Sequence, residues 1–283
     1  MSARDHGAVL ARIRLVHPFP SVLNGLTVLV IAMLAGGSIP VAVRLALAMT
    51  AFQFAIGSLN DLVDAPRDAG RNPPKPIAAG LISTSTARLV VVTFIGIGIA
   101  LTVPSGLGTV AVGLAGLSCG IVYDLRLSRS AASWLPLAVA LPLVPVFASI
   151  GVSGRISSDV LALVPLAMLA GSGLAIGNAL VDEPADRGLG RRTVAVALGR
   201  RTGWLLHSVL FALTIVLLGL VRMPGGGPIV AVPMVAGIAG IVSGAALLAM
   251  DGNRWRRAGW ALEAAGTAML GVTWFIGPGT GSG

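Results

Sequence analysis

Nine long apolar runs restrict the fold of this chain more than any other feature of its sequence. A helix rises about 1.5 Å per residue and the hydrocarbon core of a membrane is about 30 Å thick, so a membrane span needs about 20 mostly apolar residues. Runs of roughly this length lie at residues 19–37, 39–62, 85–103, 107–123, 133–152, 160–180, 203–221, 229–250 and 258–276. We therefore expect an all-α integral membrane protein with nine transmembrane helices.

The composition agrees with a membrane protein and excludes other classes. Of the 283 residues, 55% are hydrophobic and 11% charged, whereas a soluble domain carries roughly 25% charged residues. A single cysteine cannot form an internal disulfide, and three scattered histidines do not form a zinc motif. We expect residues 19–276 to form one domain, between an N-terminal segment at 1–18 and a flexible tail at 277–283.

The basic residues predict the orientation of the chain in the membrane. Of the 20 Lys and Arg, all but Arg44, Arg155 and Arg222 fall in the N-terminal segment or in every second loop after it. The positive-inside rule therefore places the N-terminus and these loops in the cytoplasm and the C-terminus outside. Because the basic residues lie in short loops and share no soluble face, the net charge of +9 does not indicate nucleic acid as a partner.

A short internal repeat links two of the predicted cytoplasmic helix ends. Residues 60–68 read NDLVDAPRD and residues 178–186 read NALVDEPAD, with six of nine positions identical. The two copies end the second and sixth apolar runs, which indicates two similar four-helix halves plus a ninth helix. A proline precedes the last Asp of each copy, so we expect Asp68 and Asp186 to lie beyond the helix, on the first turn of a loop.

The repeat predicts a diphosphate site. Six of the 11 acidic residues fall in the two copies, and such a cluster beside apolar surroundings needs cations to neutralise it. Carboxylates suit Mg²⁺, which proteins commonly share with substrate phosphates, and nearby arginines can bind phosphate oxygens. The flanking basic residues are Arg67, Arg71, Lys75, Arg187, Arg191 and Arg192.

Two other interpretations remain open at this point. The motifs could be solvated loops whose mixed charges reflect topology alone, although two matching copies at equivalent helix ends disfavour this. Paired carboxylates also occur in cation-coupled transporters, but there they belong near the middle of the membrane, whereas these lie at its cytoplasmic side.

The residues resemble the UbiA superfamily of intramembrane prenyltransferases. That family has an NDxxDxxxD-type motif after its second span and a DxxxD-type motif after its sixth, on a nine-helix fold. Here the first motif is followed by Arg71, Lys75, Pro76 and Gly80, and the second by Arg191, Arg192, Thr193, Leu198 and Gly199. The resemblance covers the whole chain in motif order, helix ends and number of spans.

The resemblance implies a central chamber and a Mg²⁺-dependent transfer of an isoprenyl group from its diphosphate to an aromatic or other lipophilic acceptor, within membrane lipid. Two Mg²⁺ ions would bridge the substrate diphosphate and Asn60, Asp64, Asp68, Asp182 and Asp186. Asp64 and Asp182 would be essential for catalysis, and Asp61 is a candidate base for the released proton. The diphosphate would contact Asn60, Arg67, Arg71, Lys75, Tyr123, Arg126, Arg191 and Arg192, while Asn24 in the first span would line the acceptor chamber.

One departure from the family pattern leaves the reaction open. The family usually has a Tyr and a nearby Lys after its fourth span, whereas Tyr123 is followed by arginines, of which Arg126 or Arg129 could replace the lysine. Arginine is planar and not equivalent to an ammonium. The alternative reading is a terpene cyclase of the same family, which acts on a prenyl diphosphate without an acceptor.

Overall fold

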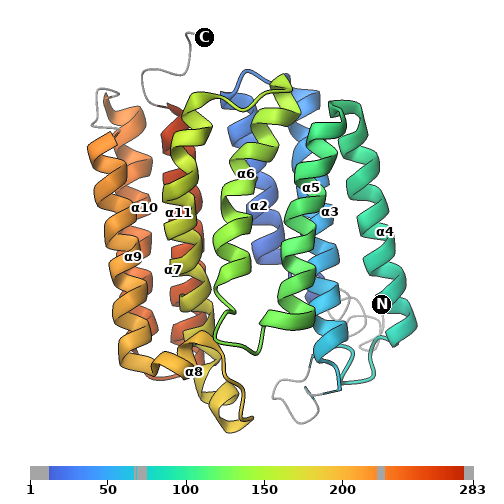
Figure 1. Cartoon of the computed structure of the whole chain (residues 1–283), viewed down its shortest axis with the longest axis vertical. Helices are drawn as coiled ribbons and strands as arrows, with labels where there is room; N and C mark the ends of the chain where they lie inside the picture. The colour runs from blue at the N-terminus through green and yellow to red at the C-terminus, as the bar shows by residue number, and fades with distance from the viewer. Residues whose placement is uncertain (1–12, 67, 69–74, 222–226, 277–283) are drawn as a thin grey trace, which may run out of the picture.

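The computed structural model describes residues 13–66, 68, 75–221 and 227–276, and these residues form helices without any strand. The helices run side by side in one bundle (Figure 1). Their bounds are α2 (Pro18–Leu34), α3 (Ile39–Asp64), α4 (Thr84–Thr102), α5 (Leu107–Val122), α6 (Leu135–Ser153), α7 (Ser158–Gly188), α8 (Val194–Leu198), α9 (Arg200–Val221), α10 (Gly227–Ala249) and α11 (Asn253–Ile276).

The helices of the bundle fit a multi-pass membrane protein. Within the described ranges, seven helices are long and apolar enough to cross a membrane: α3, α4, α5, α6, α7, α9 and α10. The apolar helix α2 has 17 residues, and α11 has 24 residues but begins with the charged sequence NRWRR. Large apolar side chains on the outside of the bundle, such as Leu220 and Val235, are more than half exposed, as lipid-facing residues are.

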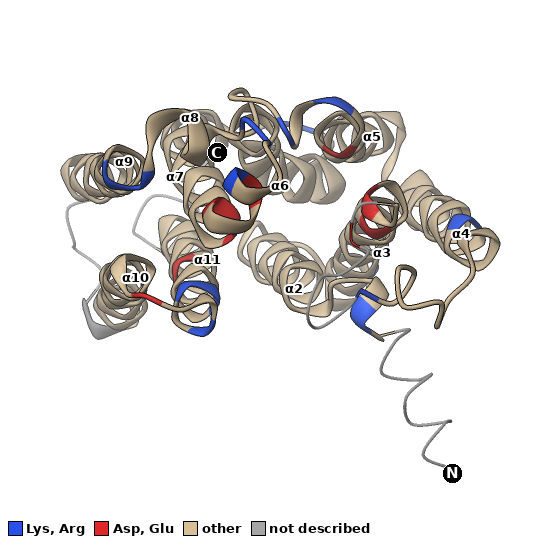
Figure 2. Cartoon of the chain, turned by 90° about the horizontal axis from the view of Figure 1, so that it is seen from below, with Lys and Arg blue, Asp and Glu red and all other residues tan. Residues whose placement is uncertain are grey.

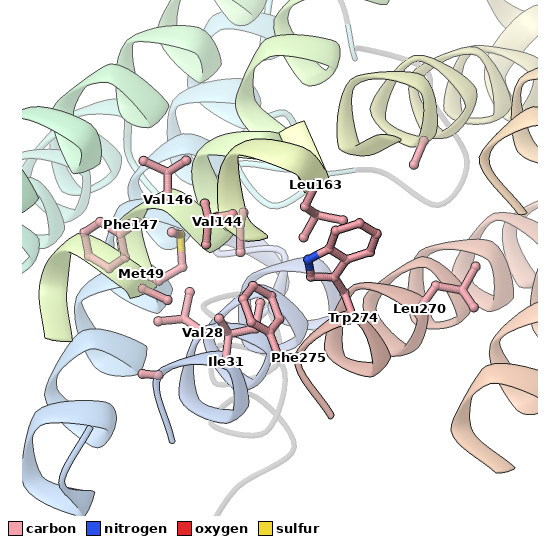
Figure 3. Close-up of a cluster of buried hydrophobic side chains, with 14 of the residues drawn as sticks. Val28, Ile31, Met49, Val144, Val146, Phe147, Leu163, Leu270, Trp274 and Phe275 are labelled. Carbon is pink, nitrogen blue, oxygen red and sulfur yellow. The ribbon is translucent and has the colours of Figure 1, made fainter. Parts of the chain in front are cut away.

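The core of the bundle lies between α2, α3, α6, α7 and α11. Phe147 and Trp274 are almost fully buried there with residues of the other helices (Figure 3). The Trp274 indole N–H donates to the backbone oxygen of Asp159 at 3.0 Å, so the end of α11 is fastened to the start of α7. Buried polar groups need such partners, above all in a membrane.

Glycines let α10 and α11 approach closely. A Cβ on Gly266 would lie 2.6 Å from the backbone oxygen of Gly237, and one on Gly259 would lie 2.6 Å from that of Gly244. Lipid provides no hydrophobic force between helices, so their association relies on close van der Waals packing, which small residues allow.

The two repeat copies end their helices differently, which corrects one of the sequence expectations. As expected, α3 ends at Asp64 and Asp68 lies beyond it. In the second copy, α7 continues through Pro184 to Gly188, so Asp186 is helical. The additional turn is stabilised by an ion pair between Arg187 and Glu183, 2.6 Å apart at i and i+4.

Candidate active site at the ends of α3 and α7

A cavity of about 370 Å³ lies at the end of the bundle where α3 and α7 finish. Acidic residues of both helices line it, and Figure 2 shows from below the acidic residues on α3 and α7. Both motifs reach its wall, with Asn60 and Asp64 from α3 and Asn178, Asp182 and Asp186 from α7. The internal repeat therefore forms one site, built from two sequence segments more than a hundred residues apart.

Lys75 links the acidic residues of the first motif. Its Nζ lies 3.0 Å from Asp61 Oδ1, 3.1 Å from Asp68 Oδ2 and 3.9 Å from Asp64 Oδ2. It also donates to the side-chain oxygen of Asn60 at 3.3 Å. The ammonium thus lies among four oxygen-bearing side chains and also lines the cavity.

Lys75 keeps its positive charge in this position. Burial lowers the pKa of its ammonium, but the carboxylates of Asp61, Asp68 and Asp64 outweigh that effect and raise the pKa above its ordinary value. A charged lysine is therefore available to meet phosphate oxygens in the cavity.

Asp61 lies behind the wall of the cavity and contacts His17, which lines it. His17 Nε2 is 3.0 Å from Asp61 Oδ1. His17 precedes α2 in a left-handed backbone conformation (φ 48°, ψ 65°), which is strained for a residue with a side chain. Gly57 of α3 allows this approach, since a Cβ there would lie 3.1 Å from the His17 Cβ.

The chain after α5 supplies a third side of the site. Residues Tyr123–Leu127 form a π-helical turn, a feature often found at functional sites. The turn brings Tyr123 and Asp124 to the cavity wall, where the side-chain N–H of Asn60 donates to Asp124 Oδ1 at 2.9 Å. Because Lys75 donates to the other end of the same amide, Asn60 is held in one orientation.

Arg129 contacts the first motif, whereas Arg126 does not line the cavity. Arg129 Nη2 lies 3.1 Å from Asp64 Oδ1. Neither arginine is part of the cavity wall, and Arg126 is exposed. Of the two arginines that could replace the missing lysine, Arg129 is therefore the one placed at the site.

On the α7 side, an arginine follows the second motif. Arg191 Nη1 donates to Asp186 Oδ1 at 3.0 Å, and both residues line the cavity. Arg192 is exposed outside the cavity, and its backbone N–H donates to the backbone oxygen of Arg129 at 3.2 Å. The segments after α5 and after α7 thus meet beside the site.

A second, apolar cavity of about 210 Å³ lies deeper in the bundle and shares Pro20, Gln53, Leu137 and Trp260 with the first. The two cavities therefore adjoin. Asn24 lines the deeper one, and no charged residue lines it in the described part of the chain.

Gln53 lines both cavities, whereas four other polar residues of the apolar runs line neither. Ser118 and Ser172 donate to backbone oxygens of their own helices. His207 of α9 and Glu263 of α11, both fully buried, lie with Nε2 and Oε1 2.9 Å apart.

The donor set of the first cavity fits Mg²⁺ when a phosphate completes it. Asn60 and Asp64 on one side, with Asp182 and Asp186 on the other, offer the hard oxygen ligands that Mg²⁺ prefers. Within the described residues, no three His, Cys, Asp or Glu side chains are gathered closely enough to hold a metal alone.

Seven of the fourteen expected site residues line this cavity, and an eighth, Asn24, lines the apolar one. Arg67 and Arg71 lie outside the described residues, and Asp61, Asp68, Arg126 and Arg192 do not form the cavity wall. Sequence reasoning missed His17, Asp124, Arg129 as a partner of Asp64, and Trp260. The left-handed His17 has no sequence signature, whereas the position of Asp124 directly after Tyr123 was a usable signal.

Comparisons with known proteins agree with this geometry. The sequence profile described as the UbiA prenyltransferase family matches residues 22–262. None of the curated protein sequences matches the chain.

Solved structures share the fold at low sequence identity. A UbiA homologue from Aeropyrum pernix K1 has a TM-score of 0.74 and 19% identity, covering 89% of this chain and 96% of its own. A UbiA homologue from Archaeoglobus fulgidus, bound to GPP and Mg²⁺, has a TM-score of 0.66 and 18% identity, covering 92% and 99%. A digeranylgeranylglyceryl phosphate synthase has a TM-score of 0.68 and 14% identity, covering 96% and 98%.

Proposed function

Because the chain belongs to the UbiA prenyltransferase family, we propose that it transfers an isoprenyl group from a prenyl diphosphate to a lipophilic acceptor and releases pyrophosphate. One observation carries this proposal: acidic motifs from α3 and α7 line a single cavity, and an apolar chamber adjoins it. The polar cavity suits the diphosphate group of a prenyl diphosphate, and the adjoining apolar cavity suits its hydrocarbon chain.

The diphosphate would lie between the two motifs. Asn60, Asp64, Asp182 and Asp186 would hold Mg²⁺, with Asp68 beside them, and the A. fulgidus homologue with GPP and Mg²⁺ supports this choice of ion. Bound Mg²⁺ would supply positive charge that stabilises the leaving pyrophosphate, and we propose two ions. Lys75 and Arg191 line the cavity and would bind phosphate oxygens directly, with Tyr123 on the same wall.

The apolar chamber would protect the reacting carbon. Once the allylic C–O bond breaks, the carbocation must be kept from water until the acceptor attacks it. The chamber is lined by apolar residues such as Leu23, Leu141 and Phe211. Asp61 would receive the released proton by way of His17, whose ring lines the cavity and touches the Asp61 carboxylate.

The acceptor would meet Asn24, a chamber residue with an amide that can donate and accept hydrogen bonds. Asn24→Leu should weaken the use of an acceptor without changing donor binding. Thr27→Val is the matched control, because the Thr27 hydroxyl also lines the chamber but donates to the backbone of its own helix at 2.8 Å.

A terpene cyclase is the second candidate, favoured by the absence of charge on the described chamber wall, which offers an anionic acceptor no partner. A cation-coupled transporter is less favoured because the motif carboxylates lie at the C-terminal ends of α3 and α7 and not midway along these helices. We further propose that α2 and α11 complete nine spans, with the motif end of the bundle in the cytoplasm.

The test is pyrophosphate release by the detergent-purified protein with geranyl, farnesyl or geranylgeranyl diphosphate and Mg²⁺, followed by mass spectrometry of the organic extract. Release that requires an acceptor and yields a prenylated product supports transfer. A cyclic hydrocarbon or alcohol formed without acceptor identifies a cyclase. Ion flux in proteoliposomes without pyrophosphate release would support the transporter.

A further inference from the structure

A second polar depression adjoins the site on the outer side of its arginines. It is a groove of about 860 Å³ between the segment after α5 and the segment after α7, lined by Arg129, Ser130, Ala131, Leu189, Gly190, Arg191, Arg192 and Ala197. Basic stretches of chain lie next to one another between α8 and α5 in Figure 2. The hydrogen bond from the backbone N–H of Arg192 to the backbone oxygen of Arg129 joins the two segments.

The charge of this groove differs from that of the catalytic cavity. Three arginines line it, and none of its described lining residues is acidic. In the catalytic cavity, Asp64, Asp182 and Asp186 face the interior. Lys75 and Arg191 also line that cavity, but its carboxylates outnumber them. We therefore expect an anion to bind there with Mg²⁺, whereas the groove offers arginines and no carboxylate on its described wall.

The arginines retain donors for a ligand. Arg129 and Arg191 each use one guanidinium nitrogen on a motif carboxylate, Asp64 at 3.1 Å and Asp186 at 3.0 Å. A guanidinium has five N–H donors, so each of these arginines keeps others for a ligand. Arg192 is exposed beside them.

We propose that this groove is a second anion site, which binds a phosphate-bearing group without Mg²⁺. Planar guanidinium groups recognise phosphate oxygens through paired hydrogen bonds. Two ligands share this chemistry. One is free pyrophosphate, which the neighbouring catalytic cavity releases if the proposed function holds, and the other is the headgroup of an anionic lipid. Arg191 lines both the cavity and the groove, so the two sites are neighbours.

The test measures binding of inorganic pyrophosphate to the purified full-length protein in neutral detergent with EDTA. Ala197 and Ala131 line the groove and are exposed, and neither belongs to a motif. Ala197→Glu adds a negative charge, and Ala197→Gln is its uncharged control of similar size. We expect pyrophosphate to bind the wild type and the Gln variant, and to bind the Glu variant about 5- to 10-fold more weakly.

The same comparison of Ala131→Glu with Ala131→Gln replaces the first pair if the Ala197 variants do not fold. The source of the ligand is identified by measuring pyrophosphate binding in nanodiscs of phosphatidylglycerol and in nanodiscs of phosphatidylcholine. If binding is lost in phosphatidylglycerol, the groove binds lipid headgroups. If binding is the same in both, the groove binds free pyrophosphate. No binding with EDTA, or equal binding by the Glu and Gln variants, overturns the proposal. Since the activity assay requires Mg²⁺ and this binding assay excludes it, either proposal can fail while the other stands.

Discussion

The Nζ atom of Lys75 lies 3.0 Å from Oδ1 of Asp61, whose side chain is 1% exposed. One ammonium group thereby joins a buried carboxylate to the surface of the cavity. Removing it would leave Asp61 with His17 as its remaining contact in the described structure.

Lys75→Met should therefore lower both stability and donor binding. Leaving one partner of a buried ion pair uncompensated costs on the order of 3 kcal/mol, and the cavity also loses a phosphate ligand. Thermal unfolding in detergent and the KM for the prenyl diphosphate measure the two effects. Arg88→Ala is the control, because Arg88 is an exposed cation on α4. Equal behaviour of the two variants would contradict the assigned position of Lys75.

The pH dependence of that stability effect follows from the raised pKa of Lys75. Below its ordinary pKa of 10.5, the lysine is protonated in the folded and the unfolded protein, so its contribution is fully present. The contribution is lost only as the pH rises through the higher folded-state pKa. The difference in thermal stability between wild type and Lys75→Met should thus stay constant from about pH 6 to about pH 9. A difference that disappears within this range would contradict the assignment.

Asp124 should act by orienting Asn60, whose amide donates to it at 2.9 Å. Asp124→Leu removes the acceptor, whereas Asp124→Asn keeps an oxygen at the same place. Mutation of a residue that hydrogen-bonds to a metal ligand typically changes the metal affinity by about 10- to 100-fold. We expect the Leu variant to need at least about tenfold more Mg²⁺ for half-maximal pyrophosphate release, and the Asn variant to stay near wild type. A Leu variant with the wild-type Mg²⁺ requirement would rule out this role.

Gly177 should be required for helix packing behind the second motif. A Cβ there would lie 3.0 Å from Glu263 Oε2 and 3.2 Å from His207 Cδ2. Gly177→Ala would have to displace this buried pair, at a cost of about 1–3 kcal/mol. Gly219 on α9 has no atom within 4 Å of an added Cβ, so Gly219→Ala should be neutral or slightly stabilising. Thermal unfolding of the two variants compares them directly, and equal melting temperatures would refute the packing argument.

The helices of the fold were largely predictable because each long apolar run in the sequence indicates its own helix. The expected run at 39–62 became α3 (Ile39–Asp64), and the run at 203–221 lies within α9 (Arg200–Val221). Short elements such as α8 and the π-helical turn span five residues each, too few to show a period. The proline alone predicted an end to the helix, whereas α7 continues through Pro184, and Glu183 and Asp186 pair with arginines there.

The candidate site was predictable where the repeat specified it. Asn60, Asp64, Asp182 and Asp186 are motif positions, and the structure places all four on one cavity wall. Contacts that join distant segments had no such signal. Asp61 meets His17 across 44 residues and Asn60 meets Asp124 across 64, and no pattern in one sequence encodes these distances.

The measurement that tests the central claim most directly is Mg²⁺-dependent pyrophosphate release by Asp64→Ala, Asp182→Ala and Asp251→Ala, each checked for folding by thermal unfolding. Asp64 and Asp182 line one cavity from opposite motifs, whereas Asp251 is exposed in the turn between α10 and α11. If the two motifs form one diphosphate site, each of the first two variants loses turnover while remaining folded, and Asp251→Ala retains it. Near-normal release by a folded Asp64→Ala or Asp182→Ala protein would contradict the claim.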